Sequence, residues 1–126
     1  MRRKVIAILG LFLTLAFLIG PTVVSGEESI TAADAAKFTG QQKTVCGTVA
    51  SANYATRSKG QPTFLNLDQP YPRQVFTVLI WGSDRGRFQE PPEALSGKRI
   101  CVTGVIQSYR GRPEIVVKDP TQIKAK

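Results

Sequence analysis

Two hydrophobic patterns divide the chain. Residues 5–20 form an uncharged apolar run, VIAILGLFLTLAFLIG. From Lys43 onward, apolar and polar residues alternate with a period of two, and Gly and Pro interrupt the alternation. This second pattern is typical of half-buried β-strands joined by turns. The sequence therefore predicts a leading apolar segment followed by an all-β domain.

The alternation predicts five strands. They cover residues 43–55, 63–68, 74–81, 98–109 and 112–118. Pro92 can open a short helix that ends at Gly97, between the third and fourth strands. Arg110-Gly111 favours a tight hairpin turn, and Gly47 favours a β-bulge in the first strand. The order β-β-β-α-β-β is that of a five-stranded OB-fold Greek-key barrel.

Residues 1–26 have the layout of a secretory signal peptide. Basic residues 2–4 precede the apolar run, Gly20-Pro21 breaks a helix, and residues 24–26 are candidates for the cleavage site. The competing interpretation is an uncleaved anchor, because residues 5–24 match the roughly 20 residues that span a bilayer. We expect a secreted or periplasmic protein with no membrane span after cleavage. N-terminal anchoring to the membrane is the alternative.

A polar leader is expected between the signal peptide and the barrel. Thr31 and Asp34 have the spacing of a capping box, and Gly40 ends the helical turn that would follow. Ile30 and Phe38 would then pack on one end of the domain. The expected division is a signal peptide (1–26), a polar leader with a short helix (27–42), an OB-fold domain (43–123) and a tail (124–126).

Cys46 and Cys101 are the two cysteines. Each has the opposite strand parity to its apolar neighbours, so both sulfurs should point away from the core. In the Greek-key order the first strand lies beside the fourth, which makes a cross-strand disulfide geometrically plausible. An exported protein can keep it, and it would contribute on the order of 4 kcal/mol. The alternative is two free, partly buried thiols.

Charge and histidine content narrow the function classes. The chain has 17 Lys+Arg, 9 Asp+Glu and no His, giving a net charge of +8. Without His there is no Ser-His-Asp triad, Cys-His pair or His-ligated zinc, and two cysteines cannot complete a four-cysteine zinc site. We therefore expect no cofactor, no metal and no catalysis. The acids Asp84, Glu90, Glu93 and Glu114 show no dedicated metal or acid–base spacing and are expected to pair with neighbouring arginines.

The export signal accounts for part of the charge. Residues 1–26 hold three bases and no acid, so the remaining 100 residues keep 14 bases against 9 acids. A surplus of five positive charges favours a polyanionic partner.

Five segments carry a family resemblance: VCGTV (45–49), FLNLD (64–68), FTVLIW (76–81), KRICVTGVI (98–106) and YRGRPEI (109–115). Together they resemble exported bacterial OB-fold modules, which are relatives of the tRNA-anticodon/helicase-type OB domain and occur alone or attached to secreted nucleases. The resemblance covers residues 43–123. It implies an OB fold and nucleic-acid binding. No nuclease catalytic segment accompanies it here, so hydrolysis is not implied.

A single strand of nucleic acid requires cations for its phosphates and flat side chains on which its bases stack. OB folds usually bind on the face of strands two and three, flanked by the loops after strands one and four. Cations occupy both loops here and also flank the third strand. The candidate binding residues are Tyr54, Arg57, Lys59, Phe64, Arg73, Trp81, Arg85, Arg87, Tyr109, Arg110 and Arg112.

Strand parity separates core from surface on the third strand. The set expected in the core is Phe76, Val78 and Ile80. Trp81 belongs to the other set, which makes it a stacking candidate beside Phe64 or Asn66 of the second strand. The alternatives are core packing for Phe64, a barrel-end plug for Trp81, loop packing for Tyr71 and a solvated surface for the arginines.

The sequence thus predicts an exported, non-catalytic OB-fold protein that binds single-stranded DNA or RNA with weak sequence preference. An envelope protein- or oligosaccharide-binding module is the alternative, because the same fold hosts many functions.

Overall fold

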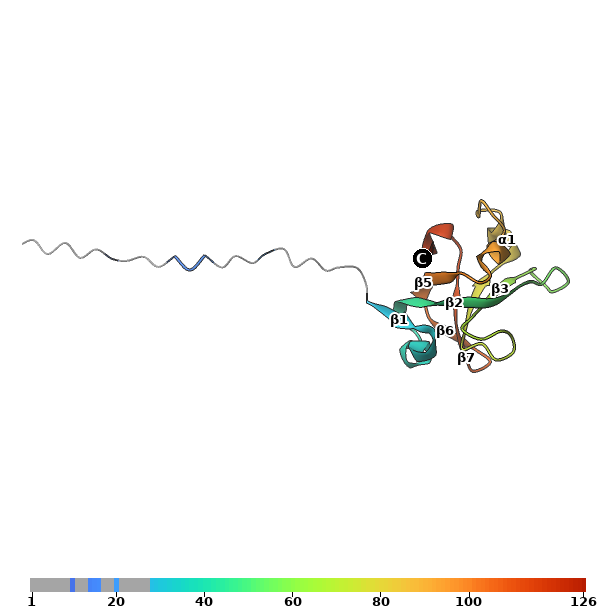
Figure 1. Ribbon diagram of the computed structural model, residues 1–126, viewed down its shortest axis with the longest axis horizontal. Coiled ribbons are helices and arrows are strands. Elements are labelled where there is room, and N and C mark those ends of the chain that lie inside the picture. The colour runs from blue at the N-terminus through green and yellow to red at the C-terminus, as the bar shows by residue number, and fades with distance from the viewer. Residues whose placement is uncertain (1–9, 11–13, 17–19, 21–27) are drawn as a thin grey trace, which may run out of the picture.

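The computed structural model describes residues 10, 14–16, 20 and 28–126, and strands dominate residues 28–126 (Figure 1). The strands are β1 (Ser29–Thr31), β2 (Gln42–Tyr54), β3 (Thr63–Leu67), β4 (Phe76–Ile80), β5 (Arg99–Val105), β6 (Gln107–Tyr109), β7 (Arg112–Val116) and β8 (Ile123–Ala125). The helical segments are η1 (Ala32–Phe38), α1 (Gly82–Arg85), η2 (Pro92–Leu95) and η3 (Pro120–Gln122).

The strand pairing is consistent with an all-β, OB-like barrel. The long strand β2 pairs antiparallel with β5 through its first half and with β3 through its second half. β3 continues to β4, and β4 pairs in parallel with β7. The last strands close on each other where Gly104 of β5 passes β7, since a Cβ at this glycine would lie 2.6 Å from Cγ2 of Ile115.

The expectation of five strands is wrong, because the described chain forms eight. The expected fourth strand is split into β5 and β6 at Ile106. Its amide donates to the carbonyl of Gln41 (2.9 Å) and its carbonyl accepts from Gly40 (2.7 Å), so its backbone is bonded to the leader. The leader adds β1, parallel to β2, and the C-terminal residues add β8, antiparallel to β5.

The expected helical turn of the leader is present as the 3-10 helix η1. The Thr31 hydroxyl accepts a hydrogen bond from the Asp34 amide (3.2 Å), as predicted for the N-cap. Ile30 and Phe38 are partly buried against the core, also as predicted. The predicted helix after Pro92 is the single turn η2, whereas α1 was not expected.

The predicted core set of β4 is confirmed, since Phe76, Val78 and Ile80 are fully buried. The bulge predicted at Gly47 is wrong, because the register of β2 against β3 shifts between Val49 and Ser51. Gly47 instead allows the Asp68 side chain to lie close to the backbone of β2, since a Cβ at Gly47 would be 2.8 Å from the Asp68 carboxylate.

The predicted disulfide is confirmed. Cys46 and Cys101 lie directly opposite each other on β2 and β5, with their sulfurs bonded at 2.01 Å. The next outward pair on the same two strands is Thr44 and Thr103, whose hydroxyls lie 2.7 Å apart. The alternative of two free thiols is excluded.

The predicted signal peptide, residues 1–26, lies outside the described residues except at positions 10, 14–16 and 20. Among the residues whose structure is described, no helix is both long enough and apolar enough to cross a membrane.

Candidate nucleic-acid interface

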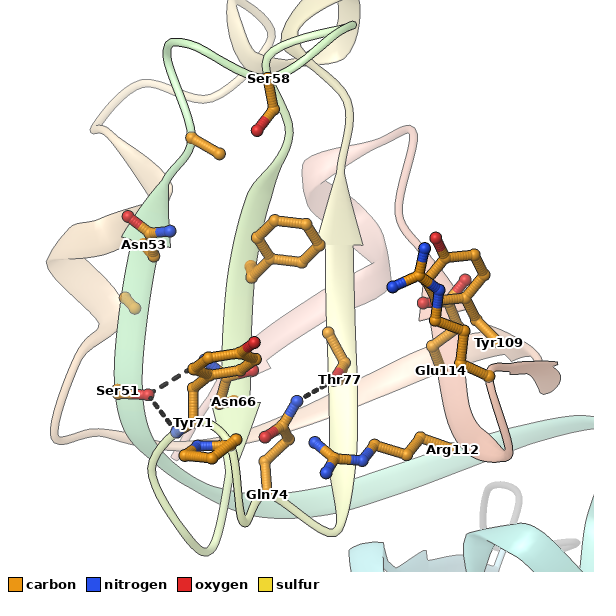
Figure 2. Close-up of a pocket in the computed structure, with 15 residues that line it drawn as sticks. Ser51, Asn53, Ser58, Asn66, Tyr71, Gln74, Thr77, Tyr109, Arg112 and Glu114 are labelled. Atoms are coloured by element: carbon orange, nitrogen blue, oxygen red, sulfur yellow. Dashed lines mark hydrogen bonds between the residues drawn. The ribbon is translucent and has the colours of Figure 1, made fainter.

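A groove of about 790 Å³ runs over the outward face of β2, β3, β4 and β7 (Figure 2). The loop 68–75 and the β6–β7 turn form its rims. It is lined by Ser51, Ala52, Asn53, Ala55, Ser58, Phe64, Asn66, Tyr71, Pro72, Gln74, Thr77, Tyr109, Arg110, Arg112 and Glu114. This is the face on which ligand binding was expected.

A row of polar side chains crosses the floor of the groove. The register aligns Ser51 of β2, Asn66 of β3, Thr77 of β4, Glu114 of β7 and Gln107 of β6. The amide of Asn66 donates to the Ser51 hydroxyl (3.0 Å), and that of Gln107 donates to the Glu114 carboxylate (2.6 Å). We call these five residues the polar row.

The loop 68–75 is bonded onto the polar row. The Tyr71 backbone amide donates to the Ser51 hydroxyl (3.2 Å), and the Gln74 side chain donates to the Thr77 hydroxyl (3.3 Å), as Figure 2 shows. Asn66, Thr77 and Glu114 are only 2%, 7% and 6% exposed, although they point away from the hydrophobic core.

Two buried acceptors in the groove have no hydrogen-bond partner among the described residues. They are Oδ1 of Asn66 and Oε1 of Gln74. A buried polar atom without a partner costs about 1–3 kcal/mol, so such atoms are rare unless a ligand or water satisfies them. Together with the Glu114 carboxylate, they make the floor rich in hydrogen-bond acceptors.

Aromatic side chains stand along the groove. Phe64 is half-buried on the outward face of β3, opposite Leu79 and Asn53, so the alternative that placed it in the core is wrong. Tyr71 and Tyr109 lie on the two rims and are 73% and 57% exposed. These rings provide flat surfaces at the middle and edges of the groove.

Arg110 and Arg112 carry positive charge to one rim. Arg110 occupies the predicted hairpin turn, where it and Gly111 have φ angles of 50° and 78°. Its guanidinium lies over the Tyr109 ring at 5.3 Å, and Arg112 extends from β7 toward Gln74 (Figure 2). None of the three ion pairs within the described ranges involves either arginine.

Tyr54 and Arg85, both predicted to bind nucleic acid, lie outside the groove and brace the barrel. The Arg85 guanidinium stacks on the Tyr54 ring at 3.7 Å, donates to the Thr63 hydroxyl (2.9 Å) and forms a bidentate ion pair with Glu93. The hydrogen bonds from Arg85 lower the pKa of Glu93, and the same contact raises the pKa of Arg85. The contact ties α1 to β3 and η2.

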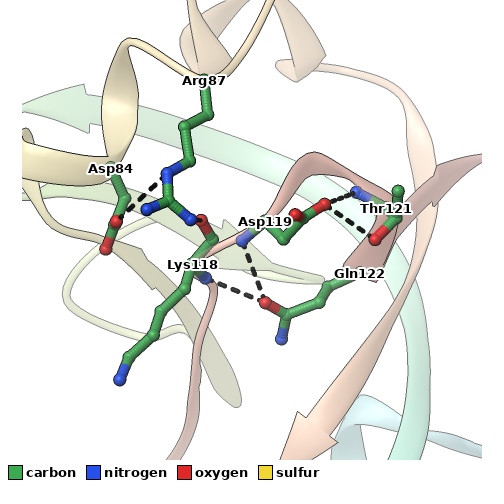
Figure 3. A network of polar contacts seen from close by, with 6 residues as sticks. All are labelled: Asp84, Arg87, Lys118, Asp119, Thr121 and Gln122. Atoms are coloured by element: carbon green, nitrogen blue, oxygen red, sulfur yellow. Dashed lines mark hydrogen bonds and ion pairs between the residues drawn. The ribbon is translucent and has the colours of Figure 1, made fainter.

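Arg87 also lies outside the groove, in a network near the C-terminal end (Figure 3). It faces Asp84 at 3.8 Å and donates to the Lys118 carbonyl (3.3 Å). Asp119 caps η3 there, and the hydrogen bond from the Thr121 amide lowers the pKa of its carboxyl group. The ion pairs of Arg85 and Arg87 confirm the expected arginine partners for Glu93 and Asp84. The same expectation is wrong for Glu90 and Glu114, because neither acid takes part in an ion pair of the described residues, and Glu114 accepts from the Gln107 amide instead.

The other predicted residues flank the groove without lining it. Arg57 and Lys59 belong to the β2–β3 loop (residues 55–62), and Arg73 belongs to the loop 68–75. Trp81 follows β4 and is 40% exposed, with its six-membered ring against Gly60. The structure thus brings together four of the predicted binding residues: Phe64, Tyr109, Arg110 and Arg112.

No protein-family profile matches the chain, and no curated protein matches it. Solved structures do match. An aspartyl-tRNA synthetase from Entamoeba histolytica is 17% identical with a TM-score of 0.53, and the match covers 86% of this chain and 23% of that one. A second aspartyl-tRNA synthetase, from Leishmania major Friedlin, is 11% identical with a TM-score of 0.51. That match covers 85% of this chain and 22% of the synthetase.

A third match is the OBody AM1L10 bound to hen egg-white lysozyme. It is 15% identical with a TM-score of 0.51, and the match covers 83% of this chain and 98% of the OBody. This chain therefore spans less than a quarter of either synthetase but nearly all of the OBody. At these identities the likeness establishes the fold alone, and that fold is an all-β, OB-like barrel.

Proposed function

We propose that this protein binds single-stranded nucleic acid in the groove over β2, β3, β4 and β7, outside the cytoplasm and without catalysing a reaction. The observation that carries the proposal is the combination of exposed rings and arginines without acidic partners around one groove. The OB-like fold of the synthetase neighbours supports nucleic-acid binding in general.

The charges indicate how a strand would lie. Arg110 and Arg112 stand at the rim, where they can replace the counterions of phosphate groups. Glu114 lies in the floor and would repel phosphate. The backbone of the strand is therefore assigned to the rim, and its bases point into the groove.

The aromatic rings and the floor would then serve the bases. Phe64, Tyr71 and Tyr109 offer stacking surfaces, and stacking tolerates every base. The acceptors on Asn66, Gln74 and Glu114 would accept hydrogen bonds from N–H groups on a base edge, as carboxylates do from the amino group of cytosine. Stacking accepts any base, whereas these acceptors favour bases that carry N–H groups at one position of the strand. Together they would give the weak sequence preference that we propose.

Two features support export and the absence of catalysis. The Cys46–Cys101 disulfide suits an oxidising compartment. The absence of histidine from the sequence removes the commonest general base and metal ligand.

Fluorescence anisotropy with labelled single-stranded and duplex oligonucleotides tests the proposal. We expect tighter binding to single strands, with log K falling by about 0.7 per phosphate contact for each unit of log salt. Arg110→Ala should reduce that slope by about 0.7. Phe64→Ala should weaken binding by about 1–3 kcal/mol and leave the slope unchanged.

Lys124→Ala is the matched control, because Lys124 is an exposed cation on β8 outside the groove. Binding that is undetectable near 50 mM salt, or that Arg110→Ala and Lys124→Ala weaken equally, would remove the basis of the proposal. Ligand capture that does not respond to salt would instead favour the protein- or oligosaccharide-binding alternative.

A further inference from the structure

Trp81 has a large aromatic side chain that does not line the groove. It is the only tryptophan in the sequence. The residue is 40% exposed and lines a separate hollow with Gly60, Gln61, Gly82 and Ser83. With that exposure Trp81 is not a core residue, and its ring takes part in no ion pair of the residues that the structure describes.

Trp81 continues a line of side chains that begins in the groove. Thr77, Leu79 and Trp81 are alternate residues, and the extended backbone at Trp81 (φ −67°, ψ 150°) keeps its side chain on the same face. Leu79 lies opposite Phe64 in the register. Successive residues on one face are about 7 Å apart, so Trp81 lies one step beyond the Phe64 position along the sheet.

The β2–β3 loop lies between the groove and the hollow beside Trp81, and it lines both. Ala55 and Ser58 of this loop line the groove, whereas Gly60 and Gln61 line the hollow beside Trp81. Gly60 has a φ angle of 78°, and a Cβ there would lie 2.9 Å from the indole ring. Its carbonyl accepts from the Gly82 amide (2.9 Å), which fixes the loop against the start of α1.

The same loop carries Arg57 and Lys59, and no ion pair of the described residues includes either cation. A strand that leaves the groove at Ser58 therefore meets positive charge on the loop and then an exposed indole. These are the two components of a single-strand site, namely a cation for phosphate and a ring for a base.

We propose that Trp81 is a second base-stacking position, separate from the groove and reached only by a strand long enough to cross the β2–β3 loop. This inference rests on the proposed function of the groove. It predicts two classes of oligonucleotide: short ones that fill the groove alone, and longer ones that also stack on Trp81.

The emission of the single tryptophan measures the second position directly, while anisotropy of a labelled oligonucleotide measures overall binding. The experiment uses the full chain and a series of single-stranded oligonucleotides of about 3 to 16 nucleotides, which spans the site sizes of OB folds. We expect short members to bind without changing tryptophan emission. Beyond a threshold length, emission should be quenched and affinity should rise in a step.

Variants separate stacking from packing. Trp81→Ala should weaken long oligonucleotides by roughly five- to 150-fold, as expected for one stacked base, and leave short ones unchanged. Trp81→Phe keeps a ring and should retain most of the rise in affinity beyond the threshold length. Trp81→Leu keeps an apolar contact with Gly60 but has no ring, and should lose that rise in affinity. An abasic strand of the same length should bind without quenching.

The two proposals fail in different ways. No binding at any length overturns the function proposed for the groove. Binding without a quench at every length, or a step that survives in Trp81→Leu, overturns the second stacking position and leaves the groove intact.

Discussion

Replacing Cys46 and Cys101 together by alanine is expected to destabilise the barrel by about 4 kcal/mol. The disulfide joins residues 55 positions apart. In the chain-entropy model, closing a loop of that length removes about 14 cal/mol/K from the unfolded state, which is about 4 kcal/mol at 25 °C. The backbone hydrogen bonds between β2 and β5 hold these strands in register without the disulfide, so we expect the folded backbone to keep its position when the bond is lost.

Urea unfolding followed by circular dichroism measures this effect. With urea slopes of about 1–3 kcal/mol/M, the midpoint should fall by roughly 1–4 M, and the reduced natural chain should behave like the double variant. The matched control is Thr44→Ala with Thr103→Ala, which removes the neighbouring hydroxyl pair and should destabilise by only about 1 kcal/mol. A loss below 1 kcal/mol in the cysteine variant would refute the entropic reasoning.

Three further substitutions test the packing and the ion pair. Glu93→Gln should lower the free energy of unfolding by about 1–2 kcal/mol at neutral pH. Since the folded-state pKa of Glu93 is depressed below its ordinary 4.5, this difference should shrink as the pH falls below that value, which urea titrations at several pH values will show. Gly104→Ala would place its Cβ against Ile115 and should destabilise by about 1–3 kcal/mol in the same assay, a result refuted by unchanged stability. Gly60→Ala should shift the emission of the free protein, because its Cβ would displace the Trp81 ring, and an unchanged spectrum would contradict the contact.

Period-two alternation located the segments that form β2, β3, β4, β5 with β6, and β7. The disulfide was predicted from the same strand parity together with the Greek-key order, which places the first strand beside the fourth. The alternation did not reveal β1 and β8, because three-residue strands contain too little alternation to be distinguished from loops. Nor could it show that Ile106 interrupts the fourth strand, since the partners of its backbone are Gly40 and Gln41, more than sixty positions earlier in the chain.

The binding face could be predicted more fully than the residues that line it. Arg110 and Arg112 were found because a cationic hairpin turn is visible in the sequence. Asn66 and Glu114 share the outward parity of Phe64 and Arg112, which is a usable signal. Their alignment in one row depends on strand register, and parity alone does not fix register.

The polar row joins parts of the chain that are distant in sequence. Ser51 and Glu114 are 63 positions apart, so the floor of the groove forms only when β7 has docked against β4. Binding in the groove and folding are therefore linked equilibria. A ligand present at 100 times its Kd should raise the free energy of unfolding by about 2.7 kcal/mol. Thermal unfolding in the presence of candidate compounds can thus identify the natural ligand of this groove without any assay of activity.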